Sequence, residues 1–330
     1  MIDRRAFVVI AGGALLPLSL TRRAQGQTPP RRIGFLAPGS RAGIEVTVNL
    51  LRPELDKLGW TDGRNIVLLE PRIAEGRNER LPALAAELVA QSPDVILVQS
   101  VPATRALMQA TKTIPIVMYA VGNPVELGIV ADFRNPGGNV TGLSILADET
   151  VRKLLQLLRE AAPRVRSVAL FVNPTNESVP PLLKVMRADA AAVGMRLQVI
   201  EVSAPGDLES AFAAIRRENT ESILLPPEPL ILSKRDAIGD FAQRHGLPLA
   251  VAAARLNLPA GGLMAYGPAS AQYAQIAARY VDRILKGAKP GDLPIEQPTR
   301  FELVINMKTA KALGLTIPQS LLLRADEVIQ

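Results

Sequence analysis

Apolar and polar positions follow two alternating patterns from residue 31 onward. Short apolar runs rich in β-branched residues, such as Asp94–Gln99 and Pro115–Ala120, are typical of strands buried on both faces. Other segments place apolar residues at helical spacing, as in Asn78–Gln91, where leucine and alanine recur every three or four positions. Because such strands and helices alternate along the chain, the pattern predicts parallel sheets covered by helices.

The alternation starts afresh after an expected strand at Asn139–Ser144. We therefore expect one lobe built from residues 31–145 plus 268–299 and a second built from residues 146–267 plus 300–330. The chain would then cross between the lobes three times. The predicted fold class is α/β, with two doubly wound, Rossmann-like lobes joined by a three-strand hinge.

The first 26 residues have the three regions of a secretory signal. A charged start precedes an apolar segment, Ala6–Leu20, and a small-residue exit follows at Ala24–Gly26. The apolar segment is shorter than the roughly 20 residues that span a bilayer. Arg4-Arg5 resembles a twin-arginine signal, although Asp3 replaces the usual hydroxyl residue, so the Tat and Sec routes both stay open. We expect a soluble periplasmic protein that is not a lipoprotein, since no lipobox cysteine is present.

Composition narrows the chemistry of the predicted cleft. The chain has no cysteine and one histidine, which disfavours thiolate and histidine metal sites. Without residues 1–26, 34 of the 38 basic and 30 of the 31 acidic residues remain, a net charge of +4 without a basic stripe. Aromatic residues make up only 4%, which disfavours stacking platforms for single-stranded nucleic acid. We expect no metal, no cofactor and no nucleic-acid partner, and a monomer.

Blocks along essentially the whole chain after residue 26 resemble a known family, most specifically near the carboxyl end. The segments Lys286–Pro298 and Phe301–Pro318, together with Asn135–Ser144 and Gly261–Gly267, are similar to blocks of ABC-transporter substrate-binding proteins related to the tryptophan-binding type. The resemblance implies a type I periplasmic binding protein fold that closes over a small solute and docks on a membrane permease. The chain departs from this family at Ala252–Ala260, where members often carry charged and aromatic residues, so the resemblance does not identify the ligand.

Ligands of parallel sheets bind beyond the carboxyl ends of the strands, so we predict binding residues in those loops. The first lobe offers Ser40, Ser100, Ala103, Thr104, Gly122 and Asn123, and the second offers Asn173, Asn176, Glu228 and Tyr266.

Hydroxyl and amide N–H groups around Ser100 and Ala103 suit a carboxylate, because a helix N-terminus favours negative charge. Glu228 is either an acceptor for a substrate amine or a solvated loop acid between two prolines. The asparagines are expected to form turns before helices, and Tyr266 either contacts ligand or packs at the hinge.

The function that we expect is a non-enzymatic solute receptor of an ABC import system, binding an amino acid or a similar carboxylate or amide. Two alternatives belong to other classes. An epimerase-type enzyme on two Rossmann-like lobes would need a phosphate-binding glycine loop or an acid–base pair. The ligand-sensing domain of a regulator would need a DNA-binding module at the amino end, where this sequence has a predicted signal peptide.

Overall fold

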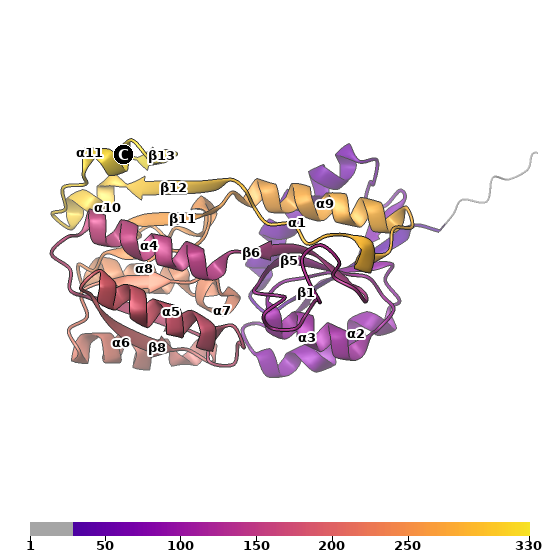
Figure 1. Cartoon of the computed structure of the whole chain (residues 1–330), viewed down its shortest axis with the longest axis horizontal. Coiled ribbons are helices and arrows are strands. Elements are labelled where there is room, and N and C mark those ends of the chain that lie inside the picture. The colour runs from indigo at the N-terminus through magenta and orange to yellow at the C-terminus, as the bar shows by residue number, and fades with distance from the viewer. Residues whose placement is uncertain (1–28) are drawn as a thin grey trace, which may run out of the picture.

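A computed structural model describes residues 29–330 and places them in two α/β lobes that lie end to end along the long axis of the molecule (Figure 1). The predicted secretory signal, residues 1–26, lies outside the described residues. The predicted α/β fold class with two doubly wound lobes is confirmed.

The first lobe is built on a six-stranded parallel sheet with strand order β2-β1-β4-β5-β6, and β3 pairs separately with β1. Its elements are β1 (Arg31–Ala37), α1 (Arg41–Lys57), β2 (Ile66–Leu68), β3 (Arg72–Ile73), α2 (Leu81–Ala90), β4 (Val95–Val98), α3 (Val101–Ala110), β5 (Ile116–Gly122), β6 (Val140–Ile145) and the later helix α9 (Ser270–Leu285).

The second lobe is built on a seven-stranded sheet with order β13-β12-β11-β10-β9-β7-β8, parallel except where β11 meets β12. Its elements are α4 (Ala147–Ala161), β7 (Ser167–Val172), α5 (Val179–Ala192), β8 (Arg196–Glu201), α6 (Leu208–Arg217), β9 (Ile223–Leu225), α7 (Pro229–Ser233), α8 (Arg235–Arg244), β10 (Leu249–Val251), β11 (Met264–Pro268), β12 (Phe301–Asn306), α10 (Met307–Ala312), α11 (Gln319–Leu322) and β13 (Glu327–Ile329).

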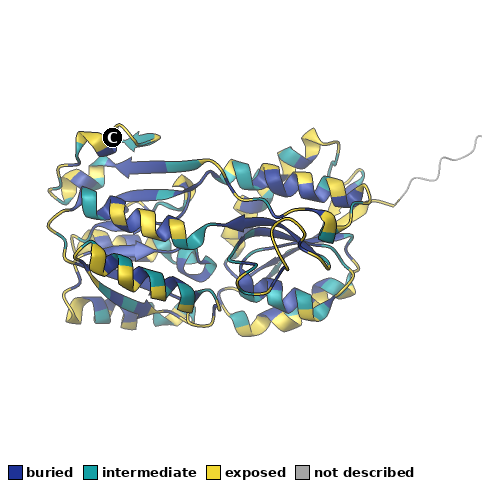
Figure 2. Cartoon of the chain, in the orientation of Figure 1, coloured by how far each residue is buried: buried dark blue, intermediate teal, exposed yellow. Residues whose placement is uncertain are grey.

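Helices cover both faces of each sheet and bury the apolar strands. In the first lobe α1 and α9 cover one face, while α2 and α3 cover the other. In the second lobe α4, α5, α10 and α11 lie on one face, and α6, α7 and α8 lie on the other. Figure 2 shows the strands buried and the outward helix faces exposed. The continuous apolar runs of the strands are explained by this two-sided burial.

Three segments connect the lobes, and hydrogen bonds tie them together. The chain leaves the first sheet after Ile145, returns from β11 into α9, and crosses again between Glu296 and Phe301. Ser144 N–H donates to the Glu296 carbonyl at 2.9 Å, and Ala269 N–H donates to the Arg300 carbonyl at 3.1 Å. These bonds hold the three crossing segments together as the hinge between the two sheets.

Gly142 in β6 lies close to the neighbouring strand. Its φ is 120°, and a Cβ atom there would lie 2.5 Å from the Met118 carbonyl oxygen and 2.6 Å from its amide nitrogen. A substitution would therefore combine backbone strain with a clash against β5, next to the first crossing segment.

We expect Gly142→Ala to lower the free energy of unfolding by about 2–5 kcal/mol, adding strain of about 1–2 kcal/mol to an overpacking cost of about 1–3 kcal/mol. Gly138→Ala is the matched control, because Gly138 has φ 62° and a Cβ there would have no neighbouring atom within 4 Å. The control should lower the free energy of unfolding only by the cost of backbone strain. Urea unfolding of both variants measures the difference, and equal losses would contradict the steric account.

Candidate functional site

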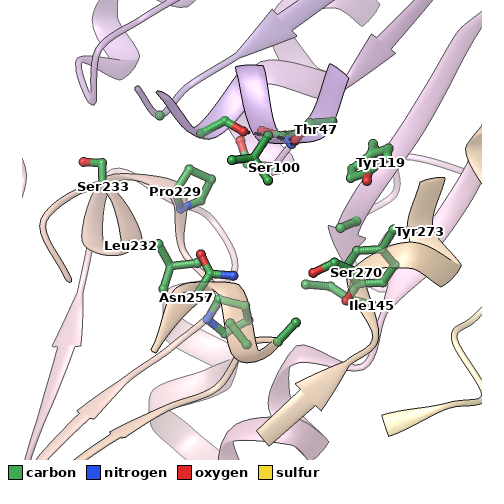
Figure 3. A pocket seen from close by; sticks show the side chains of 18 of the residues that line it. Thr47, Ser100, Tyr119, Ile145, Pro229, Leu232, Ser233, Asn257, Ser270 and Tyr273 are labelled. Atoms are coloured by element: carbon green, nitrogen blue, oxygen red, sulfur yellow. Dashed lines mark hydrogen bonds between the residues drawn. The ribbon is translucent and has the colours of Figure 1, made fainter. Parts of the chain in front are cut away.

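A cavity of about 310 Å³ lies between the two lobes. Its walls come from the loops that follow β1 and β4 and from the carboxyl ends of β5 and β6 in the first lobe, and from the loops that follow β7, β9 and β10 in the second, with α9 at one side. Figure 3 shows Thr47 and Ser100 on one side of this space and Leu232 and Asn257 across from them. Its volume is at the lower end of the range of about 300–1,000 Å³ for ligand pockets, which suits a small solute.

The first-lobe wall presents the N-termini of α1 and α3. Ser40 and Ser100 follow the adjacent parallel strands β1 and β4, so both serines lie at the same sheet edge. The Ser40 hydroxyl accepts a hydrogen bond from the Gly43 N–H at 3.3 Å and caps α1. The partial positive charge of both helix ends faces the cavity, which favours an anionic group there.

Ser100 differs from Ser40 in having its hydroxyl free. Its backbone has φ 69°, its side chain makes no capping bond to α3, and the residue is only 8% exposed. Within residues 29–330 no group hydrogen-bonds to its buried Oγ. A buried hydroxyl without a partner is costly, and a ligand in the cavity that it lines would satisfy it.

Two tyrosines form one flank of the cavity. Tyr119 is a buried residue of β5 and Tyr273 comes from α9, and their rings meet edge to face with centroids 5.9 Å apart. Burial raises the pKa of both phenols, so each remains a neutral hydroxyl at physiological pH. Figure 3 shows both rings beside Ser270 and Ile145. This flank offers apolar ring surface and neutral polar atoms.

The second-lobe wall is largely apolar. Pro227, Pro229 and Leu232 come from the loop after β9 and from α7, and Leu256 and Asn257 follow β10. Asn257 lies in the Ala252–Ala260 segment, from which the resemblance does not identify the ligand. This wall therefore offers mainly apolar surface, with the Asn257 amide among its polar groups.

Four of the ten predicted binding residues line the cavity, namely Ser40, Ser100, Gly122 and Asn176. Ala103 and Thr104 lie one turn further along α3 and are buried, and the Thr104 hydroxyl donates to the Ser100 carbonyl at 2.7 Å. These two residues support the α3 N-terminus without lining the cavity.

Asn123 and Tyr266 lie near the hinge, outside the cavity lining. The Asn123 side-chain amide donates to Asp148 Oδ2 at 3.1 Å, joining the loop after β5 to the start of α4. Burial raises the pKa of Asp148, while the bond from Asn123 opposes that rise. Tyr266 stacks on Phe301 with ring centroids 5.6 Å apart, in neighbouring strands β11 and β12. Both residues connect segments close to the crossings.

Glu228 is buried and works as a helix cap. Its Oε2 accepts from the Ile231 N–H at 2.9 Å, at the start of α7, and its Oε1 accepts from the Asn173 side-chain amide at 3.3 Å. Asn173 in turn accepts from the Thr175 hydroxyl at 2.7 Å. Both oxygens of Glu228 are therefore engaged within the second lobe, and neither Glu228 nor Asn173 lines the cavity.

Several lining residues were not among the predicted ones. Tyr119 lies three residues before the predicted Gly122 in the same strand, so its nearness to the carboxyl end of β5 could have indicated it. Tyr273 and Ser270 come from α9, which returns to the first lobe from far along the chain, and no local pattern places them beside Tyr119. Arg235, the first residue of α8, is the one charged side chain among the described lining residues.

The lobes also touch each other around the cavity. The Asn78 side-chain amide donates to the Thr175 hydroxyl at 2.8 Å, and Arg105 pairs with Glu177 at 3.2 Å. Gly39 approaches Pro229 so closely that a Cβ would lie 3.2 Å from the proline Cβ. These contacts bring the two walls together over the cavity.

Comparison with known proteins places this architecture in a family. Residues 33–329 match the family model described as ABC transporter substrate binding protein. The chain belongs to this family. Within residues 29–330 of this substrate-binding protein, no group of three or more His, Asp or Glu side chains is placed to hold a metal ion. No helix of that described part is both long and apolar enough to cross a membrane.

Individual relatives agree with the family match. A "Tyrosine-binding protein" of Clostridioides difficile is 27% identical over 263 residues, 79% of this chain and 74% of that protein. The structure of an ABC domain in complex with L-Trp from Streptococcus pneumonia has a TM-score of 0.82 at 25% identity, covering 91% of this chain and 100% of that one. A conserved domain protein from Vibrio cholerae has a TM-score of 0.81 at 29% identity, covering 90% and 99%.

Glu228 should make the stability of this substrate-binding protein depend on pH. Burial raises the pKa of its carboxyl above the ordinary value of 4.5, although the bonds from Ile231 and Asn173 oppose the rise. The contribution of Glu228 is therefore fully present below the unfolded pKa and is lost as the pH rises through the raised folded pKa.

We expect the difference in free energy of unfolding, wild type minus Glu228→Gln, to fall as the pH rises from the ordinary glutamate pKa through the raised folded pKa, because the glutamine cannot titrate. Urea unfolding at each pH measures this difference. Parallel stability profiles for the two proteins would show that the carboxyl does not titrate differently in the folded state.

Proposed function

We propose that the chain is the solute receptor of an ABC import system, capturing a small polar solute between its lobes and delivering it to a membrane permease. The solute class is an amino acid or a similar carboxylate or amide. The observation that carries this proposal is a solute-sized cavity whose walls come from the strand-end loops of both lobes across a three-segment hinge. A ligand contacting both walls favours the closed arrangement, which the permease would recognise.

Family membership and the chemistry of the walls support this proposal. The relatives named above include one called a tyrosine-binding protein and one solved in complex with L-Trp. Tyrosine and tryptophan are both small solutes with a carboxylate. The wall residues offer hydroxyls, amides and helix N-termini, which bind and orient a solute without a covalent step. We propose accordingly that the protein acts as a monomeric binding protein, not as an enzyme.

Ligand-dependent melting tests this function. Residues 27–330 are unfolded and refolded to strip bound solute, then melted with single amino acids, small carboxylates and amides. A solute at about 100 times its Kd should add about 2.7 kcal/mol to the free energy of unfolding. Ser100→Ala should reduce the shift, because Ser100 lines the cavity. Ser210→Ala is the control, since Ser210 is exposed and its hydroxyl donates to Asp207 in the second lobe.

A selective shift that Ser100→Ala reduces and Ser210→Ala leaves unchanged is the result that we expect. Turnover of any panel member without a ligand-dependent shift would contradict the receptor function and favour an enzyme.

Export of the chain is part of the same proposal. We expect the full chain to fractionate with the periplasm of a bacterium with two membranes, and residues 27–330 to remain in the cytoplasm, because residues 1–26 have the pattern of a secretory signal. Immunoblotting of the two fractions measures this. Equal distribution of both proteins would contradict the proposed location.

A further inference from the structure

The charged groups around the cavity are unevenly distributed. Among the described lining residues there is one arginine, Arg235, and there is no aspartate or glutamate. Glu228 lies between the lining residues Pro227 and Pro229, yet both its oxygens are bonded inside the second lobe. Asp148 follows the lining residue Ala147 and is bonded to Asn123. The wall therefore presents no carboxylate to a bound solute.

The groups that favour an anion lie together at Ser100 and the N-terminus of α3. The first hydrogen bond within α3 runs from the Thr104 N–H to the Ser100 carbonyl at 3.2 Å, so the N–H groups of the preceding turn have no partner within the helix. The buried Ser100 hydroxyl is likewise without a partner in the described part of the chain and lines the cavity. An unpaired hydroxyl at the end of a ten-residue helix is a site for a carboxylate.

We propose that the solute is a monocarboxylate with an apolar or aromatic body and without an α-ammonium group. This inference rests on the proposed receptor function and narrows its solute class. The carboxylate binds at Ser100 and the α3 N-terminus, and the body lies against Leu232, Pro229 and the Tyr119 ring.

An ammonium group would be desolvated in this cavity without a carboxylate partner. It would also share the cavity with two helix N-termini and Arg235, all of positive sign. The neutral phenols of Tyr119 and Tyr273 offer it only uncharged acceptors, since burial holds them protonated. An amino acid therefore loses more on entering the cavity than the same molecule without its amine.

Matched ligand pairs test this inference by calorimetry on stripped residues 27–330. The pairs are L-phenylalanine with 3-phenylpropanoate, L-tyrosine with 3-(4-hydroxyphenyl)propanoate, L-tryptophan with indole-3-propanoate, and L-leucine with 4-methylpentanoate. In the pair that fits the cavity, the acid without the amine should bind at least about tenfold more tightly, a difference of about 1.4 kcal/mol. Phenethylamine, which has the amine without the carboxylate, should not bind.

Two variants test the two parts of this inference: the carboxylate site at Ser100, and the lack of an acidic partner for an ammonium group. Ser100→Ala should weaken the preferred acid by about tenfold or more, with Ser210→Ala as the unchanged control. Asn257→Asp adds a carboxylate of nearly the same size on the wall across from Ser100, where Figure 3 shows the Asn257 amide facing the cavity. This variant should shift the preference of the same pair toward the amino acid.

The outcomes distinguish this inference from the receptor function. Equal or tighter binding of the amino acid in every pair that binds overturns the inference and leaves the receptor function standing. If no pair binds but a small solute that is not a monocarboxylate stabilises the protein, the monocarboxylate class is wrong while the receptor function stands. If no solute binds at all, both fail.

Discussion

The direction of parallel strands is the constraint on which the rest of this structure depends. Every strand of the first sheet runs the same way, so the loops after β1, β4 and β5 and the N-termini of α1 and α3 come together at one edge. The second sheet does the same with the loops after β7, β9 and β10. Because three hydrogen-bonded segments hold these edges face to face, residues distant in sequence become the two walls of one cavity.

The electrostatics of the cavity follow from this arrangement. Helices that begin at the cavity contribute the positive ends of their dipoles, and the acids near it are bonded elsewhere. Among these acids, Glu228 caps α7 and accepts a hydrogen bond from Asn173. It lies in sequence between two prolines that line the cavity. Its hydrogen bonds hold the loop that forms the wall, and the same bonds keep its oxygens turned away from the solute. The family fold thus supplies the cleft, whereas the side chains of this chain decide which charge it accepts.

Local patterns were sufficient to predict the fold class and part of the candidate site. The β-branched apolar runs and the helical spacing are local, so two doubly wound lobes could be predicted from them. Ser40 and Ser100 were predicted for the same reason, because each lies in the short loop between a strand and the helix that follows it.

Local patterns could not predict the direction of a side chain or the return of a distant segment to the site. Whether Glu228 turns toward the cavity or toward its own helix depends on the packing of α7, and Tyr273 reaches the site only because α9 returns to the first lobe. The place of Arg235 at the cavity could not be predicted either, because nothing in its local sequence indicates that the start of α8 borders the cavity.

A crystal structure of the protein with the solute that co-purifies from its native source would test the central claim most directly. The account predicts density between the lobes with an anionic group within hydrogen-bond distance, about 2.5–3.0 Å, of Ser100 Oγ. It also predicts that no ammonium group of the solute faces the α3 N-terminus. A solute bound outside this cavity, or one held there through a cationic group while Ser100 Oγ stays without a partner, would contradict the account.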